Sequence, residues 1–381
     1  MPGGKGSLHM APNVDPVLLP DSVRLYCQDS LLTALATQAP EAYMRLQTYA
    51  TQSTTLTLTV LPDLAPDNAL PVGTHLRTRN VVFPFAPGFD LGCGYSIWHL
   101  PLLRPEHCTA QLANQLARRA GAVTAPPPDT WLGTPQGENT AGHDLETQLH
   151  ATLLSEAQRC TGLATGNHYL ELHRAEPYSG TVLLIHNGGL YVSRAVQRAA
   201  LRIASRGEAI TAAQLPLLSL DARRPTGRAY ARWTTWAQTF AMQLRKQLAQ
   251  MVFDEVGVSG TLISDLMHSG VTLNRDVWEI YSGSQRLVPG MMAFIGGQVG
   301  GHGHLVQAAP GHEEVVISHG SSSMVTFNPP AQEAPGVFFN FNPPSTEWSR
   351  YATADVSMNL LAAHGLIRPV ARTVPLVVVK L

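Results

Sequence analysis

The sequence predicts one domain that mixes α-helices with β-strands, and three observations support this. Several segments place apolar residues three and four positions apart, which is the spacing of one helix face. Other short runs alternate apolar and polar residues or are continuously apolar, as strands are. Residues 21–381 contain no internal repeat and no linker-like stretch, so we expect a single domain there. Residues 1–20 are rich in Gly and Pro without periodicity, which predicts a flexible N-terminal arm.

The first elements of this domain lead to a glycine-rich turn. Residues 21–50 carry apolar side chains at helical spacing and are interrupted by Pro40, which predicts two short helices. Residues 55–61 alternate apolar and polar side chains, so we expect a strand that ends at Pro62-Asp63. A second strand is expected over residues 80–85, and it would deliver the chain to the turn.

The middle of the chain predicts two helices followed by two strands. Residues 105–120 begin with Pro and are followed by a Gly, the usual asymmetry of a helix. A long Pro- and Gly-rich loop is expected over residues 126–142, and a second helix over residues 143–160. Residues 165–173 and 181–186 are strand-like, and each segment carries a histidine at a turn.

The last third contains the strongest helical pattern, over residues 227–256. Its large apolar side chains fall three and four apart on one stripe, which we interpret as core. Strands are expected near residues 277–281, 291–295 and 315–319. A final helix over residues 355–363 precedes the apolar strand of residues 374–379.

Composition excludes several classes of function. Only 14% of the residues are charged and the formal net charge is -1, so any nucleic-acid surface must be local. The four cysteines are scattered without a CxxC pair, and no apolar segment opens the chain, so we expect a reducing, cytoplasmic location. No window approaches about eighteen consecutive apolar residues, so no membrane span is expected.

The glycine-rich turn has the arrangement of a metal-ligand pair. Asp90 and Cys93 stand three residues apart with Gly88, Gly92 and Gly94 around them, so the backbone can turn tightly and aim an oxygen and a sulfur at one point. A carboxylate and a thiolate, joined by imidazoles, suit manganese or zinc better than magnesium or calcium. The alternative is a turn that enters a strand and buries a thiol.

Four histidines share one sequence context. A single histidine beside a turn is more often a core or capping group than a ligand, but each of these lies at the edge of an apolar strand or loop beside a glycine. They are His168, His186, His268 and His319. His302-Gly303-His304 also has ligand spacing, but Gly-rich hairpins readily produce such pairs, and we interpret it as structural. Lys380 either reaches to water from the last strand or carries an ammonium group into a site.

Several short motifs follow one another between Leu61 and Lys380. They are Leu61-Pro62-Asp63, Gly88-Phe89-Asp90-Leu91-Gly92-Cys93-Gly94, Thr165-Gly166-Asn167-His168-Tyr169-Leu170-Glu171, Ile185-His186-Asn187-Gly188, Trp236-Ala237-Gln238, Met267-His268, Ser318-His319-Gly320 and the terminal Val-Val-Lys. In order and spacing they resemble the RtcB family of tRNA-splicing and RNA-repair ligases. The Asp-x-x-Cys turn and the Gly-Asn-His motif are the specific parts.

The resemblance implies an α+β fold, with packed mixed β-sheets flanked by helices, and a ligase function. The implied reaction joins an RNA 3'-phosphate or 2',3'-cyclic phosphate end to a 5'-hydroxyl end, using GTP and one or two Mn²⁺ ions. It leaves open whether an activating protein partner is needed. Carried over by motif, the metal ligands would be Asp90, Cys93, His168, His186 and His268, with the Cys93 thiolate shared between two ions. His319 would be the nucleophile that takes GMP, and the nucleotide would be held by Asn167, Glu171, Tyr351 and Lys380.

The chain departs from the family where cations or polar groups are expected to meet phosphates. The substituted positions are Ala65, Asn68, Leu190, Ser269, Tyr281, Ser282 and Ser323. Two alternatives to a ligase therefore stay open. One is a paralogue that binds metal and nucleotide or RNA ends without sealing them. The other is a metal-dependent 2',3'-cyclic phosphodiesterase, which needs the ions but not His319 as nucleophile.

Overall fold

A computed structural model of the chain describes residues 19–128, 140–297, 299–320, 338–339 and 354–381. The expected N-terminal arm lies outside these residues except for its last two positions. The described helices are α1 (Asp29–Gln38), α2 (Pro40–Ala50), α3 (Ala110–Ala120), α4 (Thr140–Arg159), α5 (Leu190–Ala204), α6 (Pro225–Val256) and α7 (Ala354–Ala363). None of these helices combines the length and the apolar composition that a membrane crossing requires.

Two large sheets carry most of the described strands. The eight-stranded sheet has the order β13-β14-β17-β6-β7-β5-β9, with β16 beside β17. Its strands are β5 (Gly94–Leu100), β6 (Tyr169–Glu176), β7 (Thr181–Asn187), β9 (Thr261–Met267), β13 (Met292–Ile295), β14 (Gly303–Ala308), β16 (Phe338–Phe339) and β17 (Ile367–Val379). The five-stranded sheet has the order β1-β2-β3-β11-β10, built from β1 (Val23–Leu25), β2 (Thr55–Ala65), β3 (Val72–Arg79), β10 (Ser269–Asn274) and β11 (Val277–Ser282).

The remaining described strands form two short pairs. They are β12 (Ser284–Leu287) with β15 (Val315–Ser318), and β4 (Val81–Val82) with β8 (Leu220–Asp221). Both pairs are antiparallel. The mixture of helices and sheets agrees with the expected α+β class.

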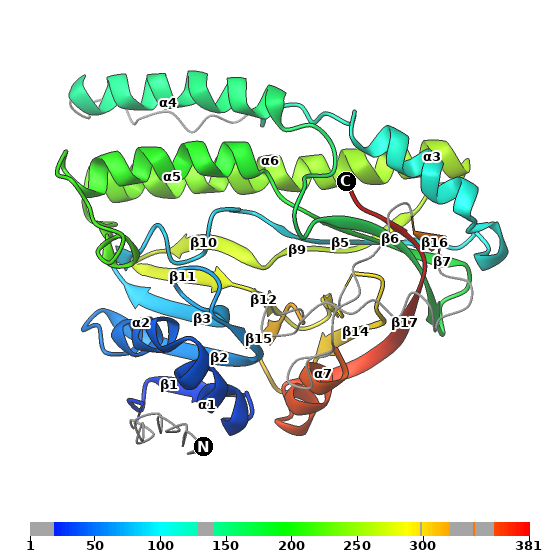
Figure 1. The fold of residues 1–381 in the computed structure, drawn as a ribbon, viewed down its shortest axis with the longest axis horizontal. Helices are drawn as coiled ribbons and strands as arrows, with labels where there is room; N and C mark the ends of the chain where they lie inside the picture. The colour runs from blue at the N-terminus through cyan, green and yellow to red at the C-terminus, as the bar shows by residue number, and fades with distance from the viewer. Residues whose placement is uncertain (1–18, 129–139, 298, 321–337, 340–353) are drawn as a thin grey trace, which may run out of the picture.

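A layer of long helices covers one side of the sheets. Figure 1 shows α4, α5 and α6 along the upper side of the molecule, with α1 and α2 at the opposite, N-terminal end. The helix α6 contacts α5, β7 and β10, and its apolar stripe, including Trp233, Phe240 and Leu244, is buried. It ends at Gly257, whose φ of 69° is the left-handed conformation that favours glycine. The helix therefore connects the two sheets through one apolar face.

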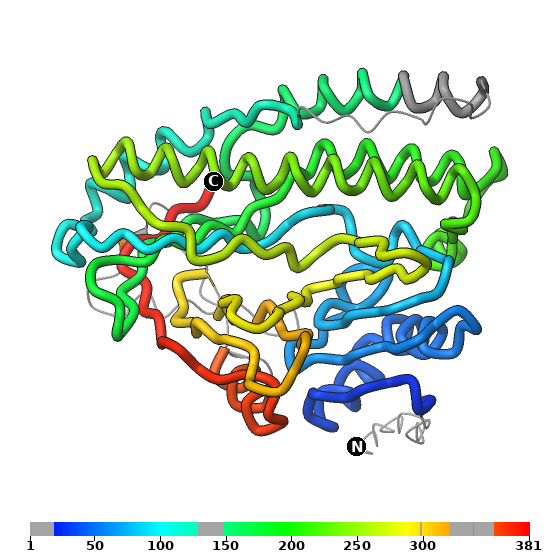
Figure 2. Tube along the Cα trace, turned by 180° about the vertical axis from the view of Figure 1, so that it is seen from behind, coloured from blue at the N-terminus to red at the C-terminus, as the bar shows by residue number. Residues whose placement is uncertain are grey.

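The strand directions bring several chain segments to one edge of the eight-stranded sheet. The neighbouring pairs β17–β6, β6–β7, β7–β5 and β5–β9 are all antiparallel. In such a run, the first residues of β5 and β6 meet the last residues of β7, β9 and β17. The view from behind in Figure 2 shows the red C-terminal strand rising to this region beside the helix layer. Five strand ends thus converge although they are far apart in sequence.

The helix predictions are largely confirmed, whereas two early strand boundaries are wrong. Pro40 is the first residue of α2, and α4, α6 and α7 lie where periodicity predicts them. The strand β2 does not end at Pro62-Asp63, because an irregularity in the β2–β3 register carries it through to Ala65. An unexpected strand, Val72–Arg79, comes first, and the strand expected over residues 80–85 is reduced to Val81–Val82, since Asn80 has a φ of 61° and turns the chain. Elements that were not predicted include the helix α5 and the strands β1, β8, β9, β10, β12, β14 and β16.

Candidate metal centre

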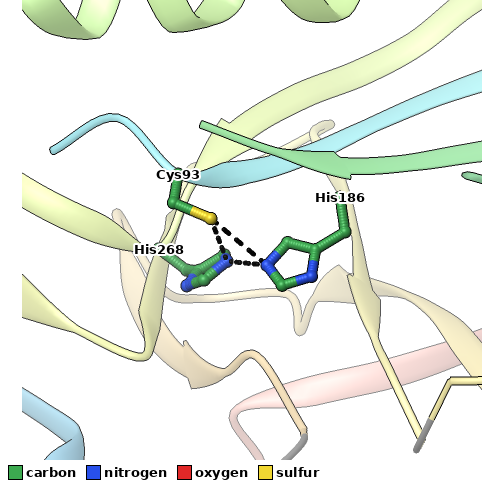
Figure 3. Close-up of side chains that lie close together, drawn as sticks. All are labelled: Cys93, His186 and His268. Atoms are coloured by element: carbon green, nitrogen blue, oxygen red, sulfur yellow. Dashed lines mark hydrogen bonds between the residues drawn. The ribbon is translucent and has the colours of Figure 1, made fainter. Parts of the chain in front are cut away.

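Side chains from the converging strand ends point toward one another. Cys93 directly precedes β5, His168 directly precedes β6, His186 lies in β7, and His268 lies between β9 and β10. Figure 3 shows Cys93, His186 and His268 directed into one space from these separate strands. Asp90 joins them from the turn before Cys93, whose backbone N–H donates to the Asp90 carbonyl at 3.1 Å. The structure therefore brings together all five side chains that the resemblance proposes as ligands.

The distances place ligand-type atoms around the Cys93 sulfur. Its Sγ lies 3.4, 3.3 and 3.6 Å from the Nε2 atoms of His168, His186 and His268. The Nε2 atoms of His186 and His268 are 2.9 Å apart, and Nε2 of His168 is 2.9 Å from Oδ2 of Asp90. Two groups of three, Asp90 with Cys93 and His168, and Cys93 with His186 and His268, each hold their ligand atoms within 4.8 Å. Cys93 belongs to both groups.

Backbone carbonyls orient two of the imidazole rings. Nδ1 of His168 lies 3.0 Å from the Thr165 carbonyl oxygen, and Nδ1 of His186 lies 3.0 Å from that of Asn167. Because a carbonyl only accepts, each Nδ1 carries the proton and donates it. The lone pair of each neutral ring is then on Nε2, which faces the sulfur. This is the tautomer that binds a metal through Nε2.

Unsatisfied polar atoms show that the residues fit a metal ion. Oδ1 of Asp90 and Nδ1 of His268 are buried and have no hydrogen-bond partner among the described residues, whereas Oδ2 of Asp90 is paired with Nε2 of His168. Such atoms are costly unless something binds them. A Cβ at Gly188 would lie 2.3 Å from Oδ2 of Asp90, so only glycine leaves room for the carboxylate there. We conclude that this group, named the thiolate centre below, can hold one or two divalent ions.

The pKa shifts show which ligand side chains must lose a proton when an ion binds. Burial lowers the pKa values of His186 and His268 well below the usual value, so both rings are neutral and ready to ligate. Burial raises the pKa of the Cys93 thiol. Burial opposes protonation of His168, but the neighbouring Cys93 sulfur and Asp90 carboxylate outweigh it and raise the pKa of this ring. Metal binding therefore releases protons from Cys93 and His168.

His319 lies next to this centre and is held by a buried carboxylate. Its ring stacks on His268, with centroids 4.7 Å apart and planes inclined by 30°. Asp63, in β2, lies 2.5 Å from Nδ1 of His319, and the same carboxylate accepts from the Ser318 hydroxyl and the Gly320 N–H. Asp63 is fully buried, so these bonds fix the ring and leave Nε2 as its reactive nitrogen. This role of Asp63 was not predicted, although the Leu61-Pro62-Asp63 motif includes the position.

Arg245 fixes the backbone around the centre. This residue of α6 is buried and makes an ion pair with Asp265 at 2.5 Å. Its Nη1 donates to the carbonyl oxygens of Gly92 and Asn187 at 2.6 and 2.8 Å. These two residues are the immediate neighbours of Cys93 and His186. One guanidinium thus positions both ligand-bearing strands.

Replacing Arg245 with Met is expected to lower the free energy of unfolding by about 3–5 kcal/mol, because the partly buried Asp265 carboxylate and two buried carbonyls lose their partner. Urea denaturation of the purified protein measures this change. The matched control is Arg119→Met, which removes an exposed ion pair to Glu255 and should cost less than about 1 kcal/mol. Equal losses in the two variants would contradict the positioning role.

The proposed nucleotide-binding residues, unlike the proposed metal ligands, do not share one buried environment. Asn167 is exposed at the edge that carries His168. Glu171 is buried, with Oε1 accepting from the Gly300 N–H at 2.6 Å and Oε2 2.8 Å from Nε2 of His173. Lys380 directly follows β17 at the same edge, and burial lowers its pKa. Tyr351 lies outside the described residues.

Positions where the resemblance expects cations are occupied by neutral side chains. The Asn68 amide donates to the Ser282 hydroxyl at 3.2 Å, and this hydroxyl donates to the Leu70 carbonyl. The Tyr281 hydroxyl donates to Glu279 at 2.5 Å. Leu190 begins α5, Ala65 ends β2, and Ser323 lies outside the described residues. These neutral contacts supply no positive charge to a phosphate.

Comparison with known proteins gives two distant relatives, and no family model matches the chain. RNA-splicing ligase RtcB2 of Escherichia coli is 22% identical over 226 residues, which cover 56% of this chain and 52% of the relative. RNA-splicing ligase RtcB1 of Escherichia coli is 22% identical over 314 residues, 71% of this chain and 74% of the relative. The chain thus spans about half the length of the first relative.

Proposed function

We propose that this protein is a GTP-dependent RNA ligase that joins 3'-phosphate or 2',3'-cyclic phosphate ends to 5'-hydroxyl ends. The observation that carries the proposal is the pairing of the thiolate centre with His319, whose ring stacks on His268 and is held by Asp63. The distant similarity to two RNA-splicing ligases agrees with this chemistry. A metal-only hydrolase would need no second, separately oriented imidazole beside its ligands.

The thiolate centre would hold Mn²⁺ through two overlapping ligand sets. One set is Asp90, Cys93 and His168, and the other is Cys93, His186 and His268. When bound, divalent ions neutralise charge on a triphosphate and on its leaving pyrophosphate. A carboxylate, a thiolate and neutral imidazoles suit a transition ion of this kind. The chain itself contributes preorganisation, because backbone carbonyls and Arg245 fix the ligands before an ion arrives.

His319 would act as the nucleophile. Its Nε2 lone pair attacks the α-phosphorus of GTP, a P–N bond forms, and the P–O bond to pyrophosphate breaks. Asp63 stabilises the positive charge that develops on the ring by holding the Nδ1 proton. A 2',3'-cyclic phosphate end would first be opened by one water molecule to a 3'-phosphate and a 2'-hydroxyl. The GMP group then passes from His319 to the RNA 3'-phosphate, and it leaves as GMP when the 5'-hydroxyl oxygen attacks that phosphate. The products are the joined RNA, GMP and pyrophosphate.

The nucleotide would lie at the sheet edge beside the thiolate centre. Lys380 and Asn167 emerge there next to His168, so an ammonium group and an amide would meet phosphate or ribose oxygens. Glu171 and Tyr351 complete the proposed set. The neutral side chains at Asn68, Tyr281 and Ser282 provide little charge for RNA phosphates, so we expect weak RNA affinity.

The decisive experiment incubates the full chain with Mn²⁺, GTP and two RNA oligonucleotides, one ending in a 2',3'-cyclic phosphate and one beginning with a 5'-hydroxyl. A joined product that requires both GTP and Mn²⁺ supports the proposal. Opening of the cyclic phosphate without GTP and without joining would instead identify a phosphodiesterase. Binding of nucleotide and RNA ends without either reaction would identify a non-ligating paralogue.

Replacing Asp63 with Asn is expected to slow GMP transfer to His319 by roughly 10³-fold or more. An amide that donates to Nδ1 moves the ring proton to Nε2 and blocks the attacking lone pair. Single-turnover labelling with GTP measures the rate. The control is Ser318→Ala, which removes a different contact of the same carboxylate and should retain most of the rate. A rate in Asp63→Asn close to that of the unaltered protein would overturn this role.

A further inference from the structure

A second cluster of ligand-type side chains lies outside the thiolate centre. Its members are His302, His304 and Asp355, and their ligand atoms lie within 4.8 Å of one another. Nε2 of His302 is 2.8 Å from Oδ2 of Asp355, and Nε2 of His304 is 2.7 Å from Oδ1. The two imidazole rings are nearly perpendicular, with an interplanar angle of 89°. Both rings therefore direct the same nitrogen at one carboxylate.

The local fold explains why the two histidines face the same way. His304 lies in β14 and His302 directly precedes that strand, so their spacing of two residues places both side chains on one face. Gly303 between them packs against Phe294, where an added Cβ would lie 2.3 Å from the ring. The glycine thus allows β14 to approach its neighbour while both imidazoles project from the other side. Asp355 arrives from the first turn of α7.

From this geometry we propose a second metal site, in which His302, His304 and Asp355 bind one borderline divalent ion of the Zn²⁺ class. Two imidazoles and a carboxylate are a recurring set for first-row transition ions. The site contains no thiolate and shares no residue with the thiolate centre. It is therefore a separate site with a different donor set.

Solvent access favours an ion at this position. The side chains of His302 and Asp355 are 31% and 46% exposed, whereas His304 is 6% exposed. One ligand thus anchors the site while the other two line an opening through which an ion can arrive. Water can occupy the remaining coordination positions, as in zinc sites with three protein ligands.

The ion would fasten α7 to the segment that precedes β14. This segment also contacts the proposed active region, because the Gly296 N–H donates to the His319 carbonyl and the Gly300 N–H donates to Glu171. An ion bound only by the folded chain stabilises it by mass action. We therefore assign the second site a structural role at the border of the active region.

Metal binding to two full-length variants tests this proposal without any ligase assay. Both variants carry Cys93→Ala to remove the shared sulfur, and one also carries Asp355→Asn. After chelator treatment, each is titrated with Zn²⁺ alone and its bound metal is measured. We expect Cys93→Ala to bind one more Zn²⁺ than the double variant and to melt at a higher temperature when Zn²⁺ is added. Equal metal content in the two variants would overturn the second site.

Cobalt spectroscopy of the otherwise unaltered chain separates the two sites by their donors. Co²⁺ bound to a thiolate gives a near-ultraviolet charge-transfer band, whereas Co²⁺ held by imidazoles and a carboxylate gives only visible ligand-field bands. We expect His302→Gln to lose visible absorbance and keep the charge-transfer band. A visible spectrum unchanged by His302→Gln would contradict the proposal. Far-ultraviolet circular dichroism of each metal-free variant checks that it folds, and failure of the ligase assay leaves this test unaffected.

Discussion

Replacing His319 with Ala is expected to abolish the covalent GMP adduct that the protein forms with Mn²⁺ and α-labelled GTP. The physical reason is that no other described imidazole beside the thiolate centre has its Nδ1 held by a buried carboxylate, as Asp63 holds that of His319. The adduct is a phosphoramidate, so its label should be lost in acid and retained in base. Denaturing electrophoresis of the labelled protein measures the loss, which should reach the detection limit.

Two controls make the result specific to the nucleophile. Metal content of His319→Ala should equal that of the unaltered protein, because His319 is not among the proposed ligands. The matched substitution is His312→Ala, which removes a ring that contacts the Gly365 carbonyl and should leave labelling unchanged. An adduct that persists in His319→Ala would disprove the nucleophile assignment. If the unaltered protein binds its metal but forms no adduct, the phosphodiesterase or binding alternatives would be favoured.

Replacing Cys93 with Ala should empty the thiolate centre of both ions and reduce GMP transfer by at least about 10³-fold. The sulfur belongs to both ligand groups, and each group would keep only two protein donors without it. Loss of the ions removes the charge neutralisation on which phosphoryl transfer depends. Elemental analysis of protein loaded with Mn²⁺ alone measures the ions, and single-turnover labelling measures the rate.

The control for this change is Cys108→Ala. Cys108 is also a buried free thiol, but it packs in an apolar cluster with residues such as Leu112 and Leu183. Its variant should bind the same amount of Mn²⁺ as the unaltered protein. If Cys93→Ala retained a full complement of Mn²⁺ at the thiolate centre, the shared-sulfur assignment would be refuted.

Much of the secondary structure follows from local pattern. Helical spacing predicted α2, α6 and α7, and Pro40 marked the start of α2, because a helix is stabilised by contacts within a few residues. Strand boundaries were less predictable. The strand β2 continues through Pro62-Asp63 because its partner β3 tolerates a register irregularity there, and that partner is distant in sequence.

The candidate site was only partly accessible from the sequence. Glycine-flanked Asp90 and Cys93, and the Gly-Asn-His motif, identified side chains that do lie together. Their roles as ligands stay predictions for the metal measurements above. The roles of Asp63 and Arg245 were not predicted. Asp63 lies in the Leu61-Pro62-Asp63 motif, but its contact with His319 is made far away in the sequence, and a lone arginine in a helix carries no motif. The sequence shows the spacing of His302-Gly303-His304, whereas the carboxylate that faces both rings comes from α7.

By itself the sequence determined which residues have the chemistry to bind a metal and to attack a phosphate, and it determined most helices. Only the tertiary structure decided which of these residues meet. Antiparallel pairing of β17, β6, β7, β5 and β9 brings five strand ends to one edge, and the separation along the chain between Asp63 and His319 is closed by a buried hydrogen bond. Side-chain chemistry is a property of single residues, whereas strand order and register depend on which distant surfaces bury each other best.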